Sequence, residues 1–134
     1  MDLDPEELNQ LSQKVIAACI EVHRELGPGL LESAYEVCLG RELSMIGIPF
    51  RRQVPIPVAY KGEILEVGYR IDLLVEERLI VELKAARLQT GLLRAQLLTY
   101  LKLMRLPLGL GVNFNHMRLV DGITRVVNNL PETP

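Results

Sequence analysis

The stretch DLLVEERLIVELKA, from Asp72 to Ala85, has the composition of two buried strands joined by a short polar loop. Aliphatic residues fill both halves, yet three charged residues lie inside the apolar run: Asp72, Glu82 and Lys84. A charge in apolar surroundings costs free energy unless it is paired or binds a metal. The stretch therefore predicts a hairpin of two buried strands, with a polar site built on it.

The length of the loop predicts the register of this hairpin. If residues 76–78 form the loop, Val75 pairs with Leu79, and Asp72 then lies opposite Glu82. Directly opposed residues in antiparallel strands have Cβ atoms roughly 4.5–5.5 Å apart. Because side chains alternate along a strand, Lys84 shares the face of Glu82. We expect two neighbouring carboxylates with an ammonium group two residues further on.

Two interpretations of this cluster remain open from spacing alone. Opposed carboxylates destabilise a sheet, but Mg²⁺ prefers such hard oxygen ligands and keeps several waters. In that case Asp72 and Glu82, with a backbone carbonyl, would hold the ion, and Lys84 would orient or help deprotonate the attacking water. The alternative is a salt bridge, in which Lys84 neutralises one of the acids at the sheet surface and no catalysis occurs.

The flanking sequence predicts a mixed α/β (α+β) fold. Apolar residues at helical spacing indicate helices over 8–26 and about 30–45, ended by glycine and proline. We expect an edge strand within 49–60, because of its prolines, and strands over 63–75 and 79–84. A helix over 89–104, a strand in 108–115 and a strand, or strand and turn, in 117–128 follow. The strands before the third helix form an antiparallel meander, and that helix crosses over to a parallel strand.

Size and composition predict one domain. The chain has 134 residues, so we expect a core over about 8–128 and a frayed polar tail at 129–134. No apolar stretch reaches the roughly 18 residues that span a bilayer, and the acidic N-terminus is not typical of a secretory signal. We therefore expect a cytoplasmic protein without membrane contact, with Cys19 and Cys38 as free thiols. The net charge of −2 argues against coating nucleic acid by charge alone, but not against a nuclease.

Several ordered blocks of the sequence resemble a known family. They are GLLESAY at 29–35 within EVHRELGPGLLESAYE at 21–36, QVPIPVAYKG at 53–62, GYRIDLLVEERLIVELKA at 68–85, AQLLTYLK at 95–102 and VNFNHMRLVDGITRVVN at 112–128. In these blocks the chain resembles the GxxExxY proteins, a group within the PD-(D/E)XK nuclease-like superfamily. The resemblance runs from about residue 12 to 129.

The resemblance implies a restriction-endonuclease-like core and a function. It implies a Mg²⁺-dependent nuclease, with Mn²⁺ as substitute, that hydrolyses phosphodiester bonds in DNA or RNA by metal-activated water. It assigns Asp72 and Glu82 as metal ligands, Glu32 as a further acidic ligand or catalytic group, and Lys84 as the catalytic lysine. Gln96 and Tyr100 match a Q-x-x-x-Y motif. Gln96 is expected to orient water or Lys84, and Tyr100 is expected to be a supporting residue. Tyr35 is the tyrosine of the GxxExxY motif and a supporting residue.

Each of these assignments has a structural alternative. Glu32 would be favoured by the helix dipole in a first turn, Tyr35 could be a packed aromatic with a hydrogen-bonding tip, and Gln96 could make a structural hydrogen bond. Leu93-Arg94-Ala95 also stands where members of the resembled family often carry His-Glu-Ala. The alternative function is a catalytically silent nuclease-like module that binds nucleic acid or assembles with protein. The edge at 49–58 could pair two copies into a homodimer, although its prolines and arginines would equally blunt it.

Overall fold

The hairpin predicted at 72–85 lies at the centre of a five-stranded sheet in the computed structural model, which describes residues 4–129. Strands β4 (Arg70–Val75) and β5 (Leu79–Lys84) pair antiparallel. Val75 lies opposite Leu79 and Leu73 opposite Val81, so the predicted register is confirmed.

The remaining strands complete a mixed sheet in the order β1-β4-β5-β6-β7. The edge strand β1 (Phe50–Pro55) pairs antiparallel with β4, and β6 (Leu108–Asn113) runs parallel to β5. Strand β7 (Ile123–Val127) pairs antiparallel with β6 after the short 3₁₀ helix η1 (Leu119–Gly122). The predicted meander, crossover helix and parallel strand are therefore confirmed.

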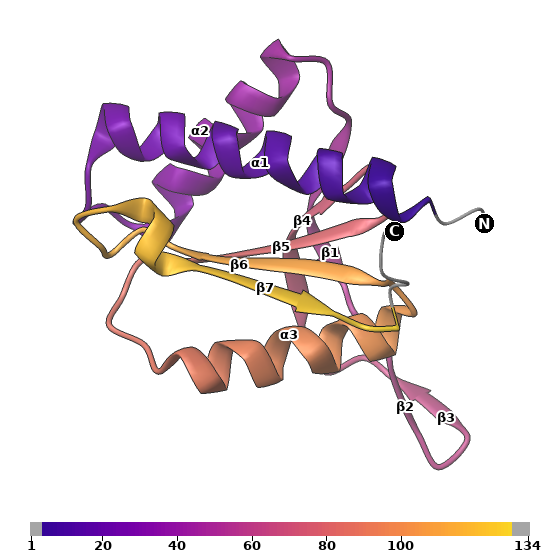
Figure 1. Cartoon of the computed structure of the whole chain (residues 1–134). Helices are drawn as coiled ribbons and strands as arrows, with labels where there is room; N and C mark the ends of the chain where they lie inside the picture. Colours follow the sequence, from indigo (N-terminus) through magenta and orange to yellow (C-terminus); the bar gives the residue numbers. More distant parts are fainter. Residues whose placement is uncertain (1–3, 130–134) are drawn as a thin grey trace.

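Helices cover both faces of the sheet (Figure 1). Helices α1 (Pro5–Leu26) and α2 (Glu32–Met45) lie on one face, and α3 (Thr90–Met104) crosses the other. Side chains alternate along β5, so Leu79, Val81 and Leu83 join the core beneath α1 and α2, whereas Ile80 joins the core beneath α3. Glu82 therefore belongs to the strand face that α3 covers.

Helix α3 packs closely on the sheet because two positions of β6 lack side chains. A Cβ atom at Gly111 would lie 2.8 Å from Leu93 Cδ2 and 3.0 Å from Leu97 Cδ1. Gly111 is also the parallel neighbour of Glu82 in the ladder. The glycine thus lets α3 approach the strand that carries the acidic residue.

The prediction of single strands over 49–60 and 63–75 was wrong in one respect. Each segment divides, and β2 (Val58–Tyr60) pairs with β3 (Glu63–Leu65) in a separate hairpin that projects from the body (Figure 1). Pro57, which has no N–H to donate, separates β1 from β2, and Gly68, at φ 82°, lies between β3 and β4.

Two further expectations concern the ends of the chain and the membrane. Residues 130–134 of the predicted tail lie outside the described residues. Within 4–129, no helix has both the length and the apolar character needed to cross a bilayer.

Candidate metal centre

The carboxylates of the two acidic residues each accept a backbone N–H from the opposite strand of the hairpin. Beyond the Leu73–Val81 pair, carboxylate oxygens replace backbone carbonyls as hydrogen-bond acceptors between the two strands. The Asp72 N–H donates to Glu82 Oε1 at 2.9 Å, and the Leu83 N–H donates to Asp72 Oδ2 at 2.8 Å. These reciprocal bonds hold the two carboxylates beside each other at the end of the hairpin. The juxtaposition is the one that the loop length predicted.

Burial raises the pKa values of both carboxyl groups in this pair. The Glu82 residue is 3% exposed, and its burial together with the charge of Asp72 raises the pKa of Glu82 to about 8. Burial also raises the pKa of Asp72, while the hydrogen bond from Leu83 and the charge of Lys84 oppose that rise. Without a compensating cation, Glu82 therefore holds its proton at neutral pH, because a buried carboxyl beside a second acid resists ionisation.

Lys84 and Glu32 lie within electrostatic reach of the pair. Partial desolvation and the charge of Asp72 raise the pKa of Glu32, whereas Lys84 lowers it. Lys84 is half-buried, and no ion pair within 4.0 Å joins it to an acid in the part of the chain that the structure describes. The alternative of a direct Lys84 salt bridge is therefore not observed in the described residues. Glu32 is the first residue of α2, where a carboxylate also suits the helix dipole.

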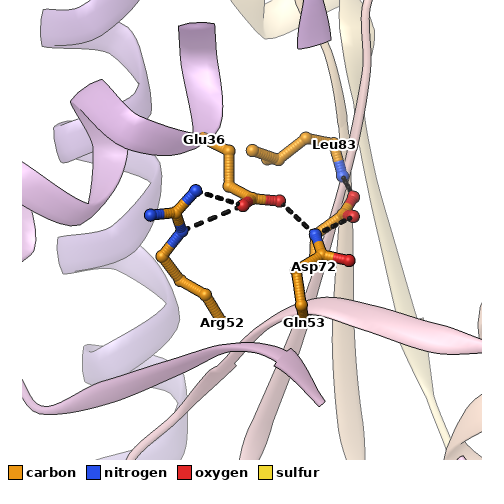
Figure 2. A network of polar contacts seen from close by, with 5 residues as sticks. All are labelled: Glu36, Arg52, Gln53, Asp72 and Leu83. Carbon is orange, nitrogen blue, oxygen red and sulfur yellow. Dashed lines mark hydrogen bonds and ion pairs between the residues drawn. The ribbon is translucent and has the colours of Figure 1, made fainter. Parts of the chain in front are cut away.

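A network of polar contacts connects Asp72 to Gln53, Glu36 and Arg52 (Figure 2). The side-chain amide of Gln53 donates to Glu36 Oε1 at 2.6 Å and to Asp72 Oδ1 at 3.3 Å. Arg52 donates through Nε and Nη2 to Glu36 Oε2, at 2.9 and 2.7 Å. Figure 2 shows Gln53 between the two carboxylates, so one amide joins α2 and β1 to the acid on β4.

Sequence reasoning did not find Glu36 or Gln53. Glu36 lies one helical turn after Glu32, which is a signal that periodicity could have supplied. Gln53 gives no such signal, because its importance depends on a left-handed backbone conformation, φ 53°, at a strand position opposite Asp72. In the structure Arg52 binds this buried acid, Glu36.

The predicted Gln96 and Tyr100 motif forms a local pair on α3. Gln96 Nε2 donates to Tyr100 Oη at 3.0 Å, and both side chains are at least half-buried. Burial and then the charge of Glu82 raise the pKa of Tyr100. The motif therefore lies close enough to the acidic pair to sense its charge.

Tyr35 is placed away from this chemistry. Its hydroxyl donates to the Gly27 carbonyl at 2.6 Å and accepts from the Leu30 N–H at 3.1 Å. Its ring stacks on Phe114 with centroids 4.2 Å apart. Tyr35 therefore fastens the connection between α1 and α2 and packs in the core.

Comparison with known families agrees with this architecture. A family model described as the PD-(D/E)XK nuclease superfamily matches residues 9–126. The chain belongs to the PD-(D/E)XK nuclease superfamily. Neither a curated protein nor a solved structure matches the chain.

PD-(D/E)XK nucleases generally use divalent metals, and the acidic pair provides suitable donors. Within residues 4–129, no group of three or more His, Cys, Asp or Glu side chains is arranged to hold a metal ion. The fit therefore depends on two carboxylates, Asp72 and Glu82, whose mutual repulsion a cation would relieve. Hard oxygen donors of this kind suit a divalent cation that completes its coordination with waters and substrate phosphates.

Proposed function

We propose that this PD-(D/E)XK protein is a divalent-cation-dependent nuclease of the GxxExxY type that hydrolyses phosphodiester bonds in DNA or RNA. The observation that supports it best is that Asp72 and Glu82 each accept a backbone N–H across the hairpin, which holds a buried and a half-buried acid together despite their repulsion. Structural ion pairs rarely place two acids in this way, whereas cation sites require it. The family match and the motif at 29–35 support the same assignment.

Each residue near the pair has a role in this proposal. Asp72 and Glu82 hold the cation, and Glu32, from the start of α2, contributes a further negative charge. A bound Mg²⁺ would polarise the scissile phosphate and lower the pKa of a water. Lys84 orients the attacking water and stabilises the negative charge that develops on the phosphate. Gln96, anchored by Tyr100, directs its amide toward water or Lys84.

The proposal is tested by cleavage assays on single- and double-stranded DNA and RNA with Mg²⁺ or Mn²⁺. Lys84→Ala should lower the cleavage rate by about 10²–10³, as loss of a group that stabilises transition-state charge does elsewhere. Lys102→Ala, an exposed lysine on α3, is the matched control and should cleave like the wild type. Thermal unfolding of both variants verifies folding. Cation-dependent cleavage that is equal in all three proteins would contradict the proposal.

One observation favours a second candidate, a catalytically silent module that binds nucleic acid or protein. In residues 4–129 the acidic side chains form no three-ligand cluster, and both carboxylates already accept backbone hydrogen bonds. This candidate predicts no cleavage of any substrate and no effect of Lys84→Ala on the protein's cellular role.

A further inference from the structure

A pocket of about 280 Å³ adjoins the proposed catalytic lysine. It lies between the end of β5 and the first half of α3, and its lining residues are Lys84, Leu88, Gln89, Leu92, Leu93 and Gln96. Two of these residues, Lys84 and Gln96, already have roles in the proposed chemistry. Whatever enters the pocket is therefore next to the phosphate that Lys84 would contact.

The lining combines flat apolar walls with amide groups. Leu88 and Leu92 are 41% and 68% exposed, and Leu93 is buried beside them. Single exposed leucines are ordinary, but here they line a concavity together. The Gln96 side chain donates an amide N–H to Tyr100, and the carbonyl oxygen of Gln96 remains available as an acceptor. Aliphatic walls suit the faces of a planar heterocycle, and amides suit its polar edge.

The size of the pocket fits one such ring system. Its volume equals that of about nine water molecules at roughly 30 Å³ each, which is ample space for one nucleobase.

Positive charge beside the pocket favours a ligand that carries an anionic group as well as an apolar one. Lys84 lines the pocket, and Arg87 is exposed on the adjoining loop and forms no ion pair among the described residues. An acyl chain or an apolar peptide side chain would cover the leucines but leave these cations without an anion. A nucleotide satisfies both features, because it joins a heterocycle to a phosphate.

We propose that this pocket receives one unpaired nucleobase of the strand whose phosphate lies at Asp72 and Glu82. The inference rests on the proposed function and deepens it: the substrate is single-stranded, or locally unpaired, nucleic acid. A base inside an intact duplex is stacked and paired, so it must first leave the helix to enter such a pocket.

Equilibrium binding tests the pocket separately from cleavage. The probes are a short fluorescent single strand, a strand of the same length whose sugars carry no bases, and the corresponding duplex. Binding is measured by fluorescence anisotropy with Ca²⁺ in place of Mg²⁺. The variant is Leu92→Ser, and the matched control is Ile64→Ser, whose side chain is 76% exposed on the projecting β2–β3 hairpin. Both sites are exposed, so both variants should fold.

The wild type should bind the intact strand about tenfold more tightly than the strand without bases, which corresponds to the lower part of the range for stacking a base. Leu92→Ser should remove this preference, and Ile64→Ser should keep it. Duplex should bind more weakly than single strand. Equal affinity for both single strands, or a preference that survives Leu92→Ser, would overturn the pocket assignment.

These outcomes are distinguishable from failure of the proposed function. If no substrate is cleaved but the base preference depends on Leu92, the pocket stands and the catalytic proposal fails. If Lys84-dependent cleavage is found but the base preference is absent, the catalytic proposal stands and the pocket assignment fails.

Discussion

At the scale of single residues, Gln53 combines an unfavourable backbone conformation with a central position. Its φ of 53° is one that glycine adopts more readily than other residues. Its amide nevertheless joins Glu36 to Asp72. Backbone strain at such a position is common near functional sites, so we expect the side chain of Gln53 to orient Asp72.

Gln53→Gly separates these two effects. We expect the substitution to leave the melting temperature unchanged or raised, because glycine relieves the strained φ, a gain of about 1 kcal/mol that offsets the lost hydrogen bonds. Cation affinity should fall about tenfold, as it does when a group that orients a ligand is removed. Calorimetric titration and thermal unfolding provide both readouts. Unchanged cation affinity would show that Gln53 has only a structural role.

The raised pKa of Glu82 makes a prediction about pH. Its pKa is about 8 in the folded protein and near 4.5 in the unfolded chain, so the fold favours the protonated form. The resulting stability is fully present below pH 4.5 and is lost as the pH rises through 8. Metal-free protein should therefore lose roughly 2 kcal/mol of unfolding free energy between pH 6 and pH 9. Each pKa unit corresponds to about 1.4 kcal/mol, and this pH range covers only part of the interval between the unfolded and folded pKa values.

Two controls identify Glu82 as the source of this loss. Glu82→Gln should abolish most of the pH dependence in urea unfolding, since the amide stays neutral. Saturating Mg²⁺ should restore the stability of the wild type at pH 9. A Glu82→Gln protein that loses as much stability as the wild type would assign the effect to other groups.

At the scale of elements, the site depends on the close packing of α3 against β6. Gly111→Ala would place a methyl group 2.8 Å from Leu93 Cδ2, so either this side chain or α3 must shift. We expect a loss of about 1–3 kcal/mol, typical of overpacking a core. Because Leu93 also lines the pocket beside Lys84, cleavage should fall as well. Leu93→Ala in the same chain should recover part of the stability; no recovery in urea unfolding would mean that the strain lies elsewhere.

The sequence predicted elements well where local spacing determines them. The three-residue loop at 76–78 determined the hairpin register, and the crossover helix determined the parallel pairing of β5 with β6. The sequence did not predict the division of β1 from β2 or of β3 from β4, because both halves of each segment have the composition of strands. Which sheet each half joins is decided by tertiary packing.

At the scale of the whole molecule, five elements contribute to the acidic pair and its surroundings. Strands β4 and β5 supply the acids, β1 supplies Gln53, α2 supplies Glu32 and Glu36, and α3 supplies Gln96. Spacing within one hairpin predicted Asp72, Glu82 and Lys84. Contacts such as Arg52 with Glu36 depend on how distant segments pack, and no pattern along the chain encodes them.

The account depends most on a divalent cation shared by Asp72 and Glu82. Titration of metal-free protein with Mn²⁺ by isothermal calorimetry tests this directly. We predict binding that Asp72→Asn and Glu82→Gln each weaken by at least about tenfold, and that the exposed control Glu63→Gln leaves unchanged. Absence of binding to the wild type, or equal binding by all four proteins, would contradict the account.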